Sequence, residues 1–238
     1  MGKNIVELTG VNKIYGTNHV VKDLTLTVEE GEFLTLLGSS GCGKTTTLRM
    51  IAGFEEPTTG SIKVEGEAIE EKEPYERDVN TVFQSYALFP HKTIYDNIAY
   101  GLKMKKVPKK EIAERVKEMM ELVQLEGFEK RYPNQLSGGQ KQLISFARTL
   151  LSDPKILVLD EATSSIDART EKLLQQGLQR LLVGRTSFII AHRLSTIKNC
   201  DKIMYIDNKG IAECGTHDQL IAKKGEYYKL YTAQHMDE

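Results

Sequence analysis

The chain has no tryptophan, only three cysteines and no excess of charge of either sign. Its 32 Lys and Arg residues face 33 Asp and Glu residues, so the formal net charge is -1. This balance removes the usual electrostatic argument for a nucleic-acid binder, which is typically basic. Cys42, Cys200 and Cys214 lack C-x-x-C spacing, which favours reduced thiols over a disulfide framework or a zinc site.

Long hydrophobic runs are also missing. The longest apolar stretches, Ile156 to Leu159 and Phe188 to Ala191, are far too short to cross a bilayer, and no apolar signal segment follows Met1. We therefore expect a protein that is made and kept in the cytosol. With 238 residues, of which 40% are hydrophobic, the chain can bury a substantial core, as one domain or one domain with a sub-lobe.

Strand-like and helix-like segments alternate along the chain. This alternation predicts a mainly parallel sheet with covering helices, an antiparallel β lobe near the front, and a helical subdomain at about residues 88–150. The expected strands are Asn4 to Leu8, Val20 to Val28, Glu32 to Leu37, short strands around Gly60 to Ile69, Lys155 to Leu159, Thr186 to Ala191 and Lys202 to Ile206. The expected helical segments are Thr45 to Ala52, Ile94 to Leu125 and Gly138 to Leu151.

A glycine-rich segment between an expected strand and an expected helix has the pattern G-x-x-x-x-G-K-[ST]. Its glycines let the backbone turn tightly enough for several N–H groups to face phosphate oxygens, and the next helix adds its positive end. The Lys44 ammonium can reach the β- and γ-phosphates, and the Thr45 hydroxyl can bind Mg²⁺. The pattern predicts a nucleotide phosphate site made of Gly38, Ser39, Ser40, Gly41, Cys42, Gly43, Lys44, Thr45 and Thr46.

Two acidic residues, Asp160 and Glu161, directly follow the apolar run Ile156 to Leu159. In open α/β sheets, ligands bind at the carboxyl ends of the strands, which is where Asp160 falls. By themselves, two acids after a strand are more typical of a helix N-cap. Because the phosphate loop is also present, we expect Asp160 to hold Mg²⁺, directly or through water, and Glu161 to polarise an attacking water.

The segment Leu136-Ser-Gly-Gly-Gln140 opens another expected helix. Ser137, Gly138 and Gly139 give a second helix end that accepts an anion, which a single phosphate loop does not need. A second phosphate-seeking surface indicates that the nucleotide of another protomer docks there. With this motif set, nearly the whole chain resembles the ATP-binding cassette (ABC) ATPases. The resemblance implies an α/β fold, a P-loop NTPase of ABC type that forms a single ATP-binding domain over residues 1–238.

The resemblance implies roles for further residues. Tyr15 matches the aromatic that stacks on adenine, and Gln84 matches the glutamine that contacts Mg²⁺ and water and senses the transmembrane partner. Asp167 matches the loop that meets the second protomer, and His192 matches the histidine that contacts the γ-phosphate. A lone tyrosine near a turn or a lone histidine after a strand is usually structural, so those roles rest on the resemblance. The implied catalytic residues are Lys44, Gln84, Glu161 and His192, and the implied metal ligands are Thr45, Gln84 and Asp160.

Cofactors and partners also follow from the family. The resemblance implies ATP and Mg²⁺, and a head-to-tail pair of cassettes that buries two ATP molecules. Each ATP would lie between one phosphate loop and Ser137, Gly138, Gly139 and Gln140 of the other chain. Hydrolysis would drive transport through membrane subunits at the inner face of the plasma membrane. No nucleic-acid partner is expected, because the basic stretch Lys103 to Lys110 is more typical of a solvated loop and helix face.

The resemblance is not uniform along the chain. Residues 1–141 resemble importer ATPases of the spermidine/putrescine type, and segments such as Val82 to His91 carry this resemblance. Residues 142–238 resemble the exporter branch, and segments such as Asp160 to Asp167 carry that resemblance. We therefore hypothesise an engineered chimera joined near Gln140 to Leu143, with a natural mosaic or a divergent natural sequence as the alternatives.

Two other readings of the motifs stay open. A DNA-repair or chromosome-type ATPase of the same superfamily would carry a long coiled coil in its helical region, whereas Gln84 to Leu136 is short and has no sustained heptads. A module that folds and binds ATP but is weakly active or uncoupled from transport would share every motif. Turnover of a purified sample separates this last class from a transport ATPase.

Overall fold

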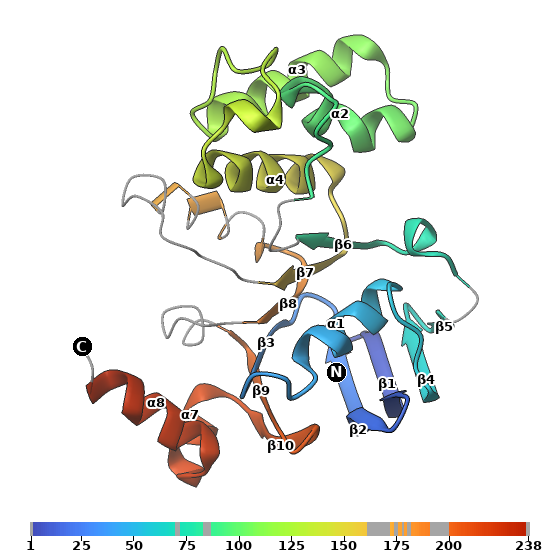
Figure 1. Ribbon diagram of the computed structural model, residues 1–238, viewed down its shortest axis with the longest axis vertical. Helices are drawn as coiled ribbons and strands as arrows, with labels where there is room; N and C mark the ends of the chain where they lie inside the picture. The colour runs from blue at the N-terminus through green and yellow to red at the C-terminus, as the bar shows by residue number, and fades with distance from the viewer. Residues whose placement is uncertain are drawn as a thin grey trace. The chain divides into compact units, whose positions relative to one another are not determined.

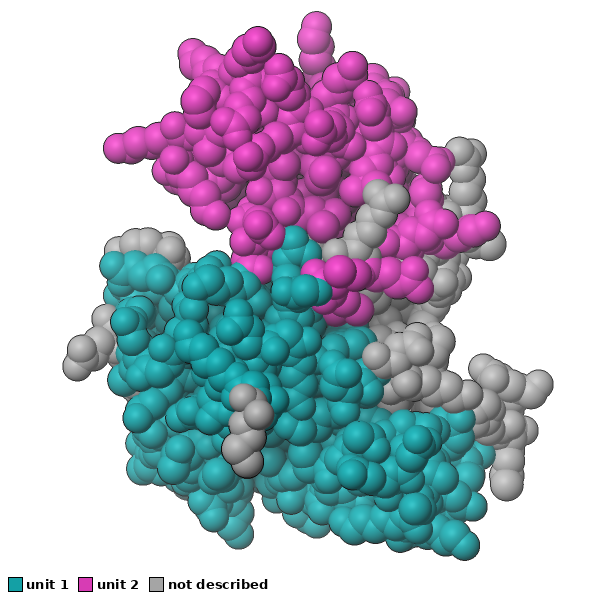
Figure 2. Space-filling view, turned by 180° about the vertical axis from the view of Figure 1, so that it is seen from behind, with its two compact units in different colours: residues 1–81, 155–161, 184–238 teal, residues 82–154, 162–183 magenta. Residues whose placement is uncertain are grey.

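The computed structural model of the protein describes residues 2–69, 72–82, 87–160, 172–173, 176–177, 179, 182–190 and 200–236. The chain divides into two compact units, coloured separately in Figure 2. The sheet unit comprises residues 1–81, 155–161 and 184–238, and the helical unit comprises residues 82–154 and 162–183. Within the described ranges, no helix is both long enough and apolar enough to span a membrane.

A six-stranded sheet forms the centre of the sheet unit, in the order β10-β9-β3-β8-β7-β6 (Figure 1). Strand β3 pairs in parallel with β8 and β9, and β7 pairs in parallel with β8, whereas β10 is antiparallel to β9. All of β8 is buried, as expected for a strand covered on both faces. The mainly parallel core is therefore confirmed, with two edge strands in addition to those predicted. The strands are β3 (Phe33–Gly38), β6 (Val79–Val82), β7 (Ile156–Asp160), β8 (Thr186–Ile190), β9 (Lys202–Asp207) and β10 (Gly210–Gly215).

An antiparallel sheet of order β2-β1-β4-β5 forms the expected β lobe. Its main feature is a hairpin in which Tyr15 pairs with Asn18 across a turn of two residues. The first of these, Gly16, has a φ of 59°, which a tight hairpin turn requires and glycine adopts readily. Both hairpin strands are longer than the sequence pattern indicates. The strands are β1 (Asn4–Tyr15), β2 (Asn18–Glu29), β4 (Thr59–Val64) and β5 (Glu67–Ala68).

One hydrophobic core joins the two sheets to the helix α1 (Lys44–Ala52). Leu8 of β1, Ile62 of β4, Leu34 of β3 and Ile51 of α1 are all almost completely buried in it. Burial of this kind stabilises the unit by roughly 1.5–3 kcal/mol per large side chain. It also fixes the direction of α1, whose first residue is the lysine of the phosphate loop.

The C-terminal helices α7 (His217–Lys223) and α8 (Glu226–Met236) follow β10. The buried carboxylate of Glu213, on β10, accepts hydrogen bonds from the backbone N–H groups of Glu226 and Tyr227, at 3.0 and 3.1 Å. A carboxylate at the positive start of a helix is favourable, and the two bonds offset its loss of water. The Glu213 carboxylate therefore ties α8 to the edge of the central sheet.

The helical unit contains α2 (Ile94–Met104), α3 (Lys109–Leu122) and α4 (Gly138–Ser152), with α2 packed against α4. The pattern predicted helix throughout Ile94 to Leu125, but the structure has two helices there. Pro108 is the N-cap of α3, and proline cannot continue a preceding helix because it lacks an N–H and clashes with the turn before it. Short 3-10 helices, Pro74–Glu76 in the sheet unit and Pro133–Gln135 here, complete the described elements.

The side chain of Asn97 organises the segment before α2. It is fully buried, accepts a hydrogen bond from the N–H of Phe89 at 2.8 Å and donates to the carbonyls of Phe89, Lys92 and Thr93. A buried amide that satisfies so many backbone groups fixes a loop which has no secondary structure of its own. Residues 87–93, which follow the predicted Gln84 closely in sequence, are thereby held on the helical unit.

Candidate nucleotide-binding site

The predicted phosphate loop lies between the last residue of β3 and the first residue of α1. Gly38, Gly41 and Gly43 have φ values of 138°, 76° and 104°, a region that side chains disfavour. A Cβ atom on Gly38 would lie 2.2 Å from the carbonyl oxygen of Ile206, and one on Gly43 would lie 2.7 Å from that of Val20. The path of the loop therefore requires glycine at both ends, as expected for a backbone that wraps closely around a phosphate.

The side chain of Lys44 folds back over this loop. Its Nζ donates to the carbonyl oxygens of Gly38 and Ser39, each at 2.8 Å, and lies 3.5 Å from the sulfur of the buried Cys42. These neutral acceptors are weaker partners for an ammonium than a phosphate oxygen would be. A phosphate bound in the loop would thus find the ammonium already close to the residues that surround it.

The first turn of α1 has no group of its own to neutralise its positive end. Its N-cap is Gly43, which offers no side-chain cap, and the first turn contains no acidic residue. Thr47 is buried and donates its hydroxyl to the carbonyl of Gly43 at 2.9 Å, whereas Thr45 is exposed and Thr46 half-buried. The helix end suits an anion, and the Thr45 hydroxyl is accessible to a cation bound with it.

Asp160 and the phosphate loop both lie at the carboxyl ends of parallel strands of the central sheet. It is the last residue of β7 and pairs with Ile190 of β8, which is itself opposite Leu36 of β3, two residues before Gly38. Parallel strands are spaced about 4.8 Å apart, so the backbones of Leu36 and Asp160 lie roughly 10 Å apart across β8. The end of β7 and the phosphate loop therefore lie two strands apart, as expected if both act on one Mg²⁺-bound triphosphate.

Tyr15 ends β1 and is 44% exposed. The Nζ of Lys13 lies 4.8 Å from the centre of its ring, a cation–π contact. An accessible aromatic ring that is held in place can stack on a base, so the position fits the predicted adenine contact.

The Ser137–Gln140 segment belongs to the helical unit and begins α4. Ser137 is the N-cap: its hydroxyl accepts from the N–H of Gln140 at 3.3 Å, and the Gln140 side chain accepts from the N–H of Ser137 at 3.0 Å. Ser137 and Gly138 are exposed, Gly139 is buried, and the first turn contains no acid. The segment is therefore a capped and accessible helix start, and the positive end of the helix favours an anion.

Four predicted site residues lie outside the described part of the chain. They are Gln84, Glu161, Asp167 and His192. Asp160 is described for its backbone only. The roles assigned to these residues stay predictions.

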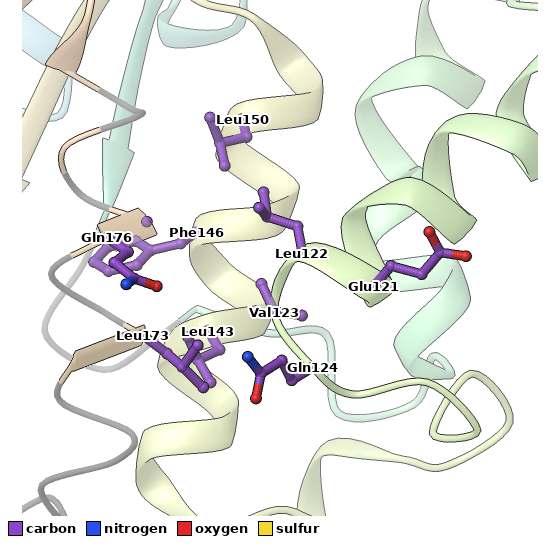
Figure 3. Close-up of a pocket in the computed structure, with 10 residues that line it drawn as sticks. Glu121, Leu122, Val123, Gln124, Leu143, Phe146, Leu150, Leu173 and Gln176 are labelled. Atoms are coloured by element: carbon purple, nitrogen blue, oxygen red, sulfur yellow. The ribbon is translucent and has the colours of Figure 1, made fainter.

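A cavity of about 280 Å³ lies within the helical unit (Figure 3). Its wall includes the apolar side chains of Leu122, Val123, Leu143, Phe146 and Leu150. Among the lining residues that the structure describes, none carries a positive charge that would attract a phosphate. The phosphate loop, and not this cavity, is the candidate nucleotide site.

The family model described as ABC transporter matches residues 21–164. This range holds the phosphate loop, the start of α4 and the end of β7. The chain belongs to the ABC transporter family. Within that family it corresponds to the ATP-binding cassette, which is the ATPase domain.

The curated relatives are import components. The spermidine/putrescine import ATP-binding protein PotA of Clostridium novyi is 45% identical over 223 residues, which cover 92% of this chain and 64% of that protein. The protein of the same name from Haemophilus ducreyi is 47% identical over 217 residues, 90% of this chain and 58% of that one. The chain therefore spans less than two thirds of the length of these relatives.

Two solved structures show the same fold. One is a dimeric post-hydrolysis state of the ATP-binding cassette MJ0796 with ADP and Pi, at a TM-score of 0.80 and 28% identity, covering 89% of this chain and 98% of that one. The other is a bacterial Atm1-family ABC exporter with ATP bound, at a TM-score of 0.83 and 31% identity, covering 98% of this chain and 42% of that one.

These matches do not divide at the predicted join. The importer protein of Clostridium novyi aligns over 92% of the chain, and the exporter structure covers 98%. The alignment with the importer protein and the alignment with the exporter structure therefore both extend across Gln140 to Leu143. The chimeric origin stays a prediction.

Sequence reasoning missed the residues that surround Tyr15. Lys13, Arg49 and Glu55 form a charged cluster with it. These residues come from β1, from α1 and from the segment after α1, and no short motif links them. Only the placement of the two segments side by side brings the cluster together.

Proposed function

We propose that the chain binds Mg·ATP at residues 38–46 and hydrolyses it as one member of a head-to-tail pair. The loop geometry is the observation that carries this proposal. Two glycines that admit no side chain and a lysine folded over the loop form a cradle for phosphate oxygens, at the uncapped start of a helix. Lys44 neutralises charge that develops on the γ-phosphoryl group.

The donor set also suits a metal ion. Mg²⁺ prefers oxygen ligands, and Thr45, Asp160 and Gln84 would hold it. When bound, the ion neutralises phosphate charge and orients the triphosphate. The accessible hydroxyl of Thr45 and the position of Asp160 at the same sheet edge support this assignment. Glu161 orients the attacking water, and His192 contacts the γ-phosphate.

The second half of each site would come from a partner copy. The start of α4 presents Ser137 and Gly138 to solvent with no acid in its first turn. Such a helix end binds an anion, and the phosphate loop of the same chain already has its own helix end. The MJ0796 cassette is dimeric in its post-hydrolysis state, which supports pairing of this kind.

In this proposal the hydrolytic cycle powers transport through membrane subunits at the inner face of the plasma membrane. The names of the curated relatives, spermidine/putrescine import proteins, favour polyamine uptake. The transported compound would be selected by the membrane subunits and any binding protein, because a cassette contributes energy and not the transport path.

An ATPase assay at increasing protein concentration tests the proposal. With Mg²⁺, phosphate release per chain should rise with protein concentration, because two chains are needed for each site, and EDTA should abolish it. Turnover that is independent of protein concentration would contradict the paired site. Absence of Mg²⁺-dependent turnover at every concentration would contradict the hydrolytic function of the isolated chain.

A further inference from the structure

A charged cluster beside Tyr15 lies outside the phosphate loop. The carboxylate of Glu55, in the segment that follows α1, lies 3.2 Å from the Nζ of Lys13 on β1. The guanidinium of Arg49, in the last turn of α1, lies 3.8 Å from the same carboxylate. The Lys13 side chain is 13% exposed and that of Glu55 is 23% exposed, so water screens this pair less than it screens a surface ion pair.

The ammonium of this ion pair also contacts Tyr15. The Lys13 Nζ lies over the tyrosine ring, 4.8 Å from its centre. Burial raises the pKa of Tyr15, and the neighbouring Glu55 carboxylate raises it further. Burial acts to raise the pKa of Glu55 as well, but the neighbouring Lys13, Tyr15 and Arg49 side chains outweigh it and lower that pKa. Lys13 therefore holds the ring at one face, and Glu55 holds the Lys13 ammonium in place.

Further hydrogen bonds, each with at least one backbone group, join the same two segments. Lys13 donates through Nζ to the carbonyl of Glu56 at 2.7 Å, and the N–H of Ile14 donates to the hydroxyl of Thr58 at 2.9 Å. The N–H of Thr58 in turn donates to the carbonyl of Asn12 at 2.7 Å. The end of β1 and the segment after α1 thus form one unit, and Glu55 has a defined position next to Tyr15.

The helix α1 links this cluster to the phosphate loop. It begins at Lys44 and ends at Ala52, with Arg49 in its last turn. We propose that Glu55 is a positioning residue which, together with Lys13, holds Tyr15 in the orientation that stacks on adenine and so favours adenine nucleotides over phosphate chains without a base. This inference rests on the proposed ATP site. A ring that is fixed before binding loses less rotamer freedom when the base stacks, so the fixed ring gives the tighter complex.

Binding of two probes separates the base contact from the phosphate contact. The probes are a non-hydrolysable ATP analogue and inorganic tripolyphosphate, each measured by calorimetry with Mg²⁺. Glu55→Ala should raise the Kd of the ATP analogue about threefold to tenfold. It should change the Kd of tripolyphosphate by no more than about twofold. Glu55→Gln, which keeps an oxygen acceptor for the Lys13 ammonium but removes the negative charge, should fall between the parent and Glu55→Ala. The matched control is Glu56→Ala, because Glu56 is exposed and contributes only its backbone carbonyl to the cluster.

A double-mutant cycle tests whether Glu55 acts through the ring. Tyr15→Ala should raise the Kd of the ATP analogue about fivefold or more, since base stacking on an aromatic side chain contributes about 1–3 kcal/mol. In the Tyr15→Ala background, Glu55→Ala should have no further effect. Equal loss of both probes in Glu55→Ala, or an unchanged analogue affinity in either single variant, would overturn the inference. Failure of the parent chain to bind both probes would instead overturn the proposed ATP site.

Discussion

The ammonium of Lys44 lies 2.8 Å from the carbonyl oxygen of Gly38, so the residue that begins α1 is bonded to the residue that ends β3 across the loop between them. The contact places the ammonium beside backbone that admits no side chain. Both features are suited to a phosphate, and neither improves the core of the sheet unit.

Lys44→Ala should weaken Mg·ATP binding by about tenfold or more, because it removes a charge-assisted contact to phosphate. Calorimetric titration measures the affinity directly. Lys63→Ala is the matched control, because Lys63 is an exposed lysine on β4 in the same unit. An unchanged affinity in Lys44→Ala would mean that the triphosphate binds elsewhere.

Gly38→Ala and Gly41→Ala should differ in their cost to stability. A Cβ on Gly38 would meet backbone at 2.2 Å, whereas one on Gly41 would find no atom within 4 Å. Gly41→Ala should therefore cost only the left-handed backbone strain, about 1–2 kcal/mol, and Gly38→Ala should cost several kcal/mol and abolish nucleotide binding. Urea unfolding with a parallel binding titration compares them. Equal stability of the two variants would contradict the close approach at Gly38.

Glu161→Gln should keep ATP binding and lose most of the turnover. The amide can still occupy the position of the carboxylate, but it cannot polarise the attacking water as well. Phosphate release at saturating Mg·ATP, beside a binding titration, measures both properties. Hydrolysis at the parental rate would exclude Glu161 as the group that activates water.

Asn97→Ala should destabilise the helical unit by about 2–4 kcal/mol, since it leaves several buried backbone groups without their partner. Hydrogen exchange should show the loss at residues 87–93. Asn134→Ala, at an exposed position in the 3-10 helix Pro133–Gln135, should change stability by no more than about 0.5 kcal/mol. Unchanged exchange at 87–93 in the Asn97 variant would mean that the segment is held by other contacts.

Tyr227 should make the fold sensitive to alkali. Burial raises the pKa of its hydroxyl, and the nearby Cys200 and Tyr231 raise it further. Below the unfolded value of about 10, the hydroxyl is protonated in both states and contributes no pH dependence. Above it, the unfolded chain loses the proton first, so the free energy of unfolding falls as the pH rises towards the folded pKa.

Tyr227→Phe should remove this part of the pH dependence, about 1 kcal/mol between pH 9 and pH 11. At neutral pH the variant should be less stable than the parent by about 1 kcal/mol, because the hydroxyl lies 2.7 Å from Nδ1 of His217 and their hydrogen bond is lost. Urea unfolding at several pH values gives both numbers. The same alkaline slope in parent and variant would assign the effect to other groups.

The sequence predicted the central strands and the phosphate loop because their signals are local. A buried parallel strand is a short apolar run, and glycines at fixed spacing mark a backbone that must turn. The edge strand β10 escaped prediction, since its most buried residue is the charged Glu213, which bonds to the start of α8. The pattern also predicted a single helical segment where the structure has α2 and α3, because helical periodicity continued past Pro108.

The cluster around Tyr15 shows the limit of reading motifs. Lys13 and Glu55 are far apart in the sequence, and each alone is an ordinary charged residue. Their partnership depends on the packing of β1 beside the segment after α1, which local patterns do not encode. Tyr15 could be predicted from the family pattern, whereas the groups that hold its ring required the fold.

The most direct test of the account is a crystal structure of the chain with Mg²⁺ and a non-hydrolysable ATP analogue. The account predicts the triphosphate within residues 38–46, with Lys44 on its β- and γ-phosphates and Ser137 of a second copy facing the γ-phosphate. A nucleotide bound with its phosphates away from that loop would contradict it.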